Sequence, residues 1–303
     1  MTELIVDVEN LSRSFGKTKA LDGVNFQASR GKVYGLVGAN GAGKTTLIKH
    51  LLGLLRAKSG SVRVLGEDPV RNPAGVLKHI GYLSEDRDIP NWMSIEELMR
   101  YTNAYYAGWD QAYADELLDT FSLDPAKKIA TLSRGMRAQV ALISAVAHRP
   151  DLLILDEPSS GLDAVVRKDI LNAVVRTISE EGRTVVFSSH LLEEVERLSD
   201  HVTMIHQGRI TLDSSLETIN SSHHHSSFRF DDVLSATPNI ENAVSITGDG
   251  RFWSAIHHEP LVSFQESVRK LGGEVVESRS ATLEEVFVAR VGRSSARNKA
   301  DLQ

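Results

Sequence analysis

The sequence of 303 residues contains no cysteine, so disulfide bonds and cysteine-ligated metal sites are excluded. This absence fits a reducing compartment, and we expect a cytoplasmic protein. Long hydrophobic runs are also missing: no segment approaches the roughly 20 apolar residues that a membrane-spanning helix needs. Residues 1–5 show no basic region followed by an apolar run, as a secretion signal would. If the protein works at a membrane, we expect other chains to supply the spanning helices.

The chain has no surplus of basic residues. Lys and Arg number 34 against 40 Asp and Glu, which gives a formal net charge of −6. Nucleic-acid-binding domains usually carry a basic face, so we expect no nucleic-acid partner, although a local basic patch can exist within an acidic total. With 41% hydrophobic residues, the chain can bury the core of one large domain and of a smaller one.

A glycine-rich segment does stand out, directly after the apolar run Val33–Val37. Its spacing is that of the P-loop, G-x-x-x-x-G-K-[ST]. In such a loop backbone N–H groups close around phosphate oxygens, Lys44 adds a positive charge and Thr45 offers a hydroxyl to Mg²⁺. We expect the phosphate contacts to come from Gly38, Asn40, Gly41, Ala42, Gly43, Lys44, Thr45 and Thr46. The predicted flanking strand and helix (45–55) favour a nucleoside triphosphatase over an ordinary glycine-rich turn.

Two carboxylates follow another apolar run. Residues 152–155 are Leu-Leu-Ile-Leu, typical of a buried parallel strand, and Asp156 and Glu157 come next. Two acids beside apolar neighbours are costly unless a cation or substrate lies there. In a P-loop protein the strand's last Asp156 is the expected partner of Mg²⁺.

A third predicted strand, residues 184–187, is followed closely by His190. The carboxyl ends of parallel strands meet at one edge of a sheet. We therefore expect Gly38, Glu157 and His190 to converge there, although a lone histidine near a helix start is more often structural.

Two further features are ambiguous by themselves. Ser133 and Gly135 precede a predicted apolar helix (139–147), where they suit an anion site, but any helix cap looks similar. Phe15 lies ahead of the P-loop. It suits either a core position or a platform on which an adenine stacks, and its own pattern does not separate these two interpretations.

In their order along the chain these motifs resemble those of ABC transporter ATP-binding subunits, over about residues 4–217. Gly38–Thr46 is similar to Walker A, 132–136 to the signature motif, and 152–157 to Walker B with its catalytic glutamate. Residues 160–163 resemble the D-loop, His190 the switch histidine, and Phe15 the adenine-stacking aromatic, which favours that interpretation of Phe15.

The resemblance implies a site for ATP and Mg²⁺. Thr45, Asp156 and Glu85 would organise the metal, Glu157 would act as the base that activates water, and His190 would hold the γ-phosphate. It also implies a head-to-tail homodimer, in which Ser133 and Gly135 of one subunit close over the ATP of the other.

Two positions depart from the family pattern. Glu85 stands where a glutamine is usual, so it is either an anionic metal ligand or one more solvated acid of its loop. The signature, usually Leu-Ser-Gly-Gly-Gln, has Arg134 and Met136 at its third and fifth positions.

The implied fold class is α/β: a P-loop NTPase core with antiparallel β and helical subdomains, plus a small C-terminal α+β domain. We place the ATP-binding domain at 1–217, with its helical subdomain at about 92–149. Within that subdomain we expect helix over 94–118, where Ser94 and Glu97 are spaced as a capping box.

For the rest of the chain we predict a linker at 218–226, an accessory α+β domain at 227–291 and a flexible tail at 292–303. The linker contains His223, His224 and His225 among serines, which suits a solvated segment better than a metal site.

The function implied is ATP hydrolysis coupled to export through integral membrane permease subunits encoded as separate chains, at the inner face of the cell membrane. The alternative is a non-transport ABC ATPase that acts on ribosomes or DNA. Only about 90 residues separate Lys44 from Ser133, with no sustained heptad for a long coiled coil. A binding module without turnover is disfavoured because the motif residues for catalysis are intact.

Overall fold

The computed structural model describes the backbone of residues 3–258 and 260–300, and side chains within that range except 177–181 and 292–300. The chain divides between Asp213 and Ser214 into two compact units. We refer to them as the N-terminal and C-terminal units. The division lies slightly ahead of residue 217, where the sequence analysis placed it.

An antiparallel sheet opens the N-terminal unit. Its strand order is β2-β1-β4, with bounds Thr18–Ser29, Leu4–Phe15 and Ser59–Val64. Alternate residues of β2, Val24, Phe26 and Ala28, are buried, as expected for a strand with one face on the core. β1 pairs antiparallel with both β2 and β4, which agrees with the antiparallel β subdomain implied by the sequence.

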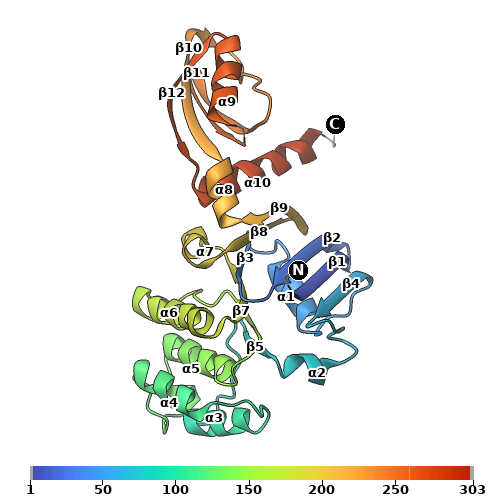
Figure 1. Cartoon of the computed structure of the whole chain (residues 1–303), viewed down its shortest axis with the longest axis vertical. Helices are drawn as coiled ribbons and strands as arrows, with labels where there is room; N and C mark the ends of the chain where they lie inside the picture. The colour runs from blue at the N-terminus through green and yellow to red at the C-terminus, as the bar shows by residue number, and fades with distance from the viewer. Residues whose placement is uncertain (1–2, 259, 301–303) are drawn as a thin grey trace. The chain divides into compact units, whose positions relative to one another are not determined.

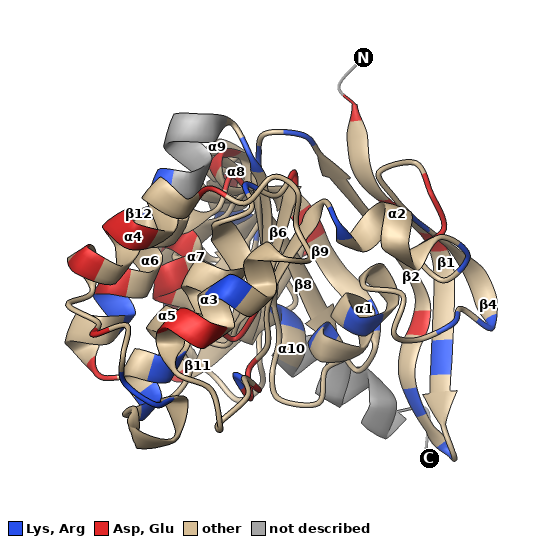
Figure 2. Ribbon diagram, turned by 90° about the horizontal axis from the view of Figure 1, so that it is seen from below, with Lys and Arg blue, Asp and Glu red and all other residues tan. Residues whose placement is uncertain are grey.

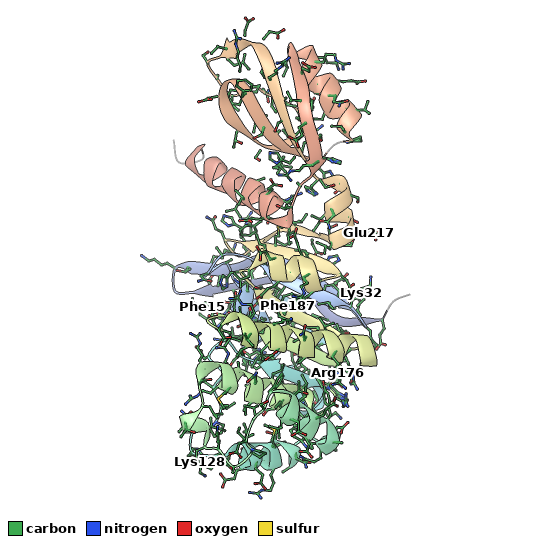
Figure 3. All side chains as sticks on the ribbon, turned by 90° about the vertical axis from the view of Figure 1, so that its left-hand side faces the viewer. Phe15, Lys32, Lys128, Arg176, Phe187 and Glu217 are labelled. Atoms are coloured by element: carbon green, nitrogen blue, oxygen red, sulfur yellow. The ribbon has the colours of Figure 1, made fainter. Side chains whose placement is uncertain are left out.

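A six-stranded sheet forms the centre of the unit, in the order β5-β6-β7-β3-β8-β9. The strands are Ile80–Leu83, Leu152–Asp156, Thr184–Ser189, Val33–Val37, His201–His206 and Arg209–Ser215. Pairing is parallel from β5 to β8. β3, β6 and β7 are buried along their whole length, which explains their continuous apolar sequences. Phe187, labelled in Figure 3, lies in β7 and is almost fully buried.

Some helices of the N-terminal unit lie beside its sheets, and others form a separate helical group (Figure 1). Three of them, α1, α2 and α7, span Lys44–Leu51, Pro73–Leu77 and Leu192–Leu198. The others, α3 to α6, span Ile95–Asn103, Gln111–Thr120, Arg134–Val146 and Ala164–Glu181, with a 3₁₀ turn η1 at Ile129–Thr131.

The predicted helix over 94–118 is two helices in the structure. α3 ends near Ala104, and α4 begins after Asp110, whose side chain caps it by accepting a hydrogen bond from Tyr113 N. Gly108 lies in the intervening turn, where a glycine disfavours continued helix. The capping box at the start of α3 is confirmed: Ser94 and Glu97 exchange both of its hydrogen bonds.

The C-terminal unit is an α+β domain, as predicted. Its sheet has the order β11-β10-β12, with bounds Ala243–His257, His224–Leu234 and Gly273–Ser280, and both pairings are antiparallel. The helices α8, α9 and α10 span Leu216–Ser222, Leu261–Lys270 and Leu283–Ala300. α9 contributes Phe264 to a core that also contains Phe228 and Trp253.

Two expectations for this unit were wrong. The segment 218–226 is not an irregular linker, because Ser215 caps α8 and the buried Ile219 anchors that helix. The helix α10 continues to Ala300, where a flexible tail was predicted from residue 292, and residues 301–303 lie outside the described part.

None of the helices in the described ranges is both long and apolar enough to cross a membrane. Figure 2 shows basic and acidic residues interspersed over the ribbon in that view.

Candidate nucleotide-binding site

The P-loop lies between β3 and α1 and borders a cleft of about 250 Å³. The lining residues are Ala39 to Thr46, Glu85 and Glu157. Gly43 has a φ of 118°, and a Cβ there would lie 2.6 Å from Ala20 O, so only glycine fits. No side chain caps α1, whose first N–H groups lack intrahelical partners. This positive helix end fits a phosphate group.

Lys44 is 5% exposed, and its ammonium group lies inside the cleft. Its Nζ donates a hydrogen bond of 2.6 Å to Gly38 O and lies 3.1 Å from Glu157 Oε1. A buried ammonium is stable only with such partners. Because Lys44 lines the cleft, a phosphate bound there would offer its ammonium group oxygen atoms in place of these two.

Ser188, near the end of β7, links the side chain of Asp156, the last residue of β6, to the backbone of Glu157, the residue after it. Its hydroxyl donates to Asp156 Oδ1 at 2.6 Å and accepts from Glu157 N at 2.9 Å. Glu157 has a φ of 49°, in the left-handed region, and such a conformation costs about 1–2 kcal/mol in a residue with a side chain. The sequence analysis missed Ser188, although a polar pair, Ser188-Ser189, ending an apolar strand is a visible signal.

His190 follows the same strand and contacts the same glutamate. Its Nδ1 lies 2.6 Å from Glu157 Oε2, and the glutamate side chain is 6% exposed. Glu157 therefore has Lys44 at one oxygen and His190 at the other. The predicted convergence with Gly38 is confirmed, and its cause is the sheet order: β6, β7 and β3 are neighbours whose carboxyl ends meet.

Two of the three residues predicted to hold Mg²⁺ line the same cleft, and the third immediately precedes Glu157, which also lines it. Glu85 follows β5, the neighbour of β6, and it lines the cleft together with Thr45, while Asp156 ends β6 itself. All three offer oxygen atoms, which Mg²⁺ prefers, and it commonly uses one or two carboxylates plus substrate phosphates. Among the described residues no group of three or more His, Asp or Glu is arranged to hold a metal alone. The set thus fits a metal bound together with a nucleotide.

Three predicted residues lie outside this cleft. Phe15, labelled in Figure 3, is 47% exposed, which excludes the core alternative. The Arg13 guanidinium lies 4.9 Å from its ring centroid. Ser133 caps α5 by accepting from Met136 N at 3.2 Å, and Gly135 packs against Val166. One chain does not bring Ser133 and Gly135 to its own P-loop.

Comparison with known proteins agrees with this geometry. The family model described as "ABC transporter" matches residues 21–160. The daunorubicin resistance ATP-binding protein DrrA3 of Streptomyces coeruleorubidus is 32% identical over 311 residues, which cover 96% of this chain and 97% of that protein. The chain belongs to the ABC transporter ATP-binding proteins.

Other members of the family support the same conclusion. The bacitracin transport ATP-binding protein BcrA of Bacillus licheniformis is 36% identical over 213 residues, 68% of each chain. A solved structure described as the ATP-binding subunit of an ABC transporter is 28% identical, with a TM-score of 0.66, and the match covers 72% of this chain and 92% of that one. As an ABC cassette, the protein binds ATP and has the predicted P-loop NTPase fold.

Proposed function

We propose that this ABC cassette is the Mg²⁺-dependent ATPase subunit of an exporter and that it works as a homodimer. The observation that carries the hydrolytic part is the position of Glu157, whose carboxylate lies in the P-loop cleft between Lys44 and His190. A general base must lie within hydrogen-bonding reach of the water that it activates, beside the phosphate to be attacked.

Different residues of the chain bind the phosphates, hold the metal ion and accept the proton. The P-loop N–H groups and Lys44 bind the β- and γ-phosphates, and Thr45, Asp156 and Glu85 hold Mg²⁺, which neutralises phosphate charge. When Lys44 moves its ammonium group to the phosphates, Glu157 Oε1 becomes free to accept the proton of a water molecule. His190 holds the other carboxylate oxygen in place, and its Nε2 contacts the γ-phosphate.

The proposal of a homodimer is supported by the separation, within one chain, of Ser133 from the P-loop cleft. Ser133 is exposed at the start of α5 and does not line the cleft that contains Lys44. A second copy, placed head to tail, supplies its Ser133 and Gly135 to the first copy's nucleotide. Phe15, exposed at the end of β1, stacks on the adenine.

Export is supported by the names of two relatives, and we propose that separate permease subunits span the membrane. DrrA3, which matches along almost its whole length, is described as a resistance protein, and BcrA as a transport protein for bacitracin. We therefore place the protein in the cytoplasm, attached to the inner face of the cell membrane through integral membrane subunits. Purification of the full chain from detergent-solubilised membranes, followed by mass spectrometry, should identify that membrane chain.

The decisive test of hydrolysis is Glu157→Gln. The amide keeps the shape of the side chain but cannot accept a proton, so ATP turnover should fall by about 10²–10⁴ while ATP binding persists. Glu193→Gln, at an exposed acid in the first turn of α7, is the matched control and should behave as wild type. Turnover of the Glu157→Gln variant close to that of the control would contradict the proposal.

A further inference from the structure

A buried arginine connects the loop after β5 to the turn that follows Glu157. Arg87 is 5% exposed and has a φ of 51°, in the left-handed region. Its Nη2 donates to Ser160 O at 2.8 Å and to Pro158 O at 3.3 Å. Both carbonyls belong to residues 158–163, which we call the 158–163 turn. The turn begins at the residue next to Glu157 and leads to α6.

Arg87 has no carboxylate at ion-pair distance in the described part of the chain, and its buried Nε has no hydrogen-bond partner there. Burial lowers the pKa of Arg87 and the nearby charge of Arg134 lowers it further, while the charge of Glu85 acts in the opposite direction. A buried guanidinium without a carboxylate costs stability. Packing alone does not explain why an arginine is buried here. Its two hydrogen bonds to carbonyl groups of the 158–163 turn do explain it.

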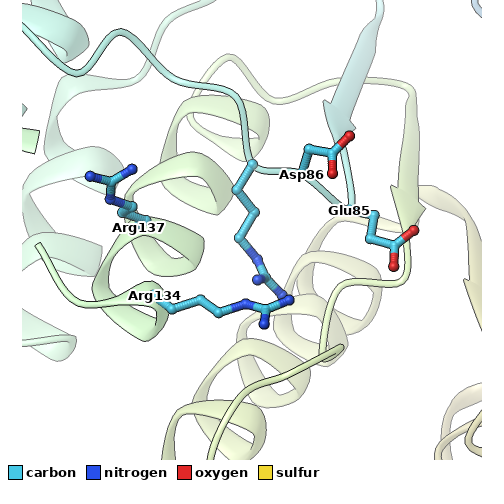
Figure 4. Close-up of a pocket in the computed structure, with 5 residues that line it drawn as sticks. Glu85, Asp86, Arg134 and Arg137 are labelled. Atoms are coloured by element: carbon cyan, nitrogen blue, oxygen red, sulfur yellow. The ribbon is translucent and has the colours of Figure 1, made fainter. Parts of the chain in front are cut away.

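A second arginine contacts the same turn from another element. Arg134 lies at the start of α5, and its Cζ would be 2.4 Å from a Cβ built on Gly161. The guanidinium therefore lies directly on the backbone of the 158–163 turn. Figure 4 shows Arg134 extending from α5, while Arg137 extends from the same helix in another direction. Arg134 is also one of the two departures of this chain from the usual signature motif.

The turn is coupled to Glu157 by a short path. Ser160 N donates to Glu157 O at 3.1 Å, so the carbonyl that Arg87 binds and the amide that bonds Glu157 belong to one residue. Glu157 is itself held in a left-handed conformation, which persists only when its surroundings enforce it. A displacement of a catalytic group by about 1 Å can cost about 10² in rate.

We propose that Arg87 is a positioning residue that fixes the 158–163 turn, and through it the carboxylate of Glu157, with Arg134 packed on the same turn. The proposal rests on the function given to Glu157 above. Because Arg87 follows Glu85 in the same loop, a movement of that loop also moves the turn, so that the metal side and the base side of the cleft shift together.

The test compares Arg87→Gln with Arg137→Gln. Arg87 and Arg137 both line a pocket of about 380 Å³, and each glutamine variant removes one positive charge from it. The Nη2 of Arg137, however, donates to Ala130 O and not to the 158–163 turn. We expect Arg87→Gln to lower kcat by about tenfold or more, while the Kd for ATP stays within about twofold, because the arginine acts on the base and not on the P-loop. Arg137→Gln should leave both values close to wild type.

Arg87→Lys provides the second variant. Its ammonium keeps the charge but falls about one bond short of the position of Nη2, so kcat should lie between that of wild type and that of the glutamine variant, about threefold below wild type. If Arg87→Gln does not fold, the lysine variant decides: lowered kcat with unchanged Kd supports the proposal, and unchanged kcat overturns it.

Two results for the glutamine variant would overturn the proposal: a kcat equal to that of Arg137→Gln, or a parallel loss of kcat, ATP affinity and melting temperature, which indicates a structural role only. Glu157→Gln measured in the same series separates the two hypotheses. If Glu157→Gln loses turnover while Arg87→Gln keeps the kcat of Arg137→Gln, only the positioning role fails, whereas normal turnover of Glu157→Gln removes the proposed function itself.

Discussion

The two units bury different kinds of polar residue. In the N-terminal unit the buried groups include the charged residues Lys44, Arg87, Asp156, Glu157 and Glu194. Among the described residues of the C-terminal unit, the buried polar side chains are those of His223, Ser226 and His257. Burial of charge costs stability, so it persists where a ligand or a reaction uses it. The contrast indicates that chemistry is concentrated in the N-terminal unit.

The core of the C-terminal unit is built for packing. Phe264 is fully buried, and its ring stacks on His257 at a centroid distance of 3.8 Å. The Ser226 hydroxyl lies 2.9 Å from His257 Nε2. Such aromatic and hydroxyl contacts stabilise a small domain without charge. Variants in each unit can test whether the two units are as separate in stability and activity as this contrast suggests.

The largest expected effect is on the stability of the C-terminal unit. Phe264→Ala removes a fully buried ring and should lower the free energy of unfolding of that unit by about 3–5 kcal/mol. ATP hydrolysis should stay close to wild type, because the residues that line the cleft all lie in the N-terminal unit. Urea unfolding followed by Trp253 fluorescence reports the first value and an ATPase assay the second.

The matched control is Val262→Ala, on the same helix but 66% exposed, which should change little. If Phe264→Ala abolished ATP hydrolysis as well, the stability of the two units would be coupled, and the contrast between them would be contradicted.

The next effect concerns the N-terminal unit and its expected partner. Lys44→Ala and Ser133→Arg should each lower turnover by about 10²–10³, since each removes a contact to the phosphates. A mixture of the two variants should recover part of the activity, because a head-to-tail heterodimer has one intact site and one doubly damaged site. ATPase assays on the mixture and on each variant alone test this, and the absence of recovery, with heterodimers shown to form, argues against composite sites.

Each unit contains one buried histidine whose pKa is about 4. Burial is the main cause for both. His148 in the N-terminal unit stacks on Tyr106 and lies 3.2 Å from Ile80 O. His223 in the C-terminal unit lies 3.1 Å from Arg290 Nη2, and the charge of Arg290 also lowers its pKa.

Both histidines should make their unit sensitive to acid. Because the folded pKa lies below the unfolded value of about 6.5, the contribution of each neutral histidine to the free energy of unfolding is fully present above pH 6.5. This contribution is lost as the pH falls toward 4. The loss should reach about 3–3.5 kcal/mol per histidine, at 1.36 kcal/mol per pKa unit. Urea unfolding at several pH values should show that His223→Gln flattens only the C-terminal transition and His148→Gln only the N-terminal one. Equal slopes in variant and wild type would refute the assignment.

The smallest effect concerns Glu85. A carboxylate beside Mg²⁺ binds it more strongly than an amide does, but it repels the γ-phosphate when metal is absent. Glu85→Gln should therefore retain ATP hydrolysis and weaken the dependence of ATP affinity on Mg²⁺. Titration of ATP with and without Mg²⁺ measures this, with Asp88→Asn, another exposed acid of the loop, as the control. An identical metal dependence in Glu85→Gln and wild type would withdraw the metal role.

The positions of some of these groups were visible in the sequence. The P-loop is a local motif, because glycine and a helix start are needed within a few residues. Its neighbours β6 and β7 were equally clear, since strands buried on both faces require uninterrupted apolar residues. Asp156, Glu157 and His190 then had to lie at one edge once the strands were parallel.

The predictions for other elements were wrong because local sequence patterns are weak evidence for those elements. The serine- and histidine-rich segment 218–226 is polar in composition, yet α8 and β10 form there. His223 is buried in it by residues from distant parts of the C-terminal unit, including Arg290. Similarly, Phe15 could not be assigned to core or surface until its 47% exposure was known.

By itself the sequence determined the nucleotide chemistry, the parallel strands and the class of each unit, since glycine spacing and hydrophobic periodicity act between near neighbours. Tertiary structure alone decided which polar groups meet across the sheet. Ser188 lies 32 residues from the aspartate that it bonds, and Arg87 lies 71 and 73 residues from its two carbonyl acceptors. Such contacts depend on how whole elements pack, and no local propensity of a serine or an arginine encodes the residue at the other end.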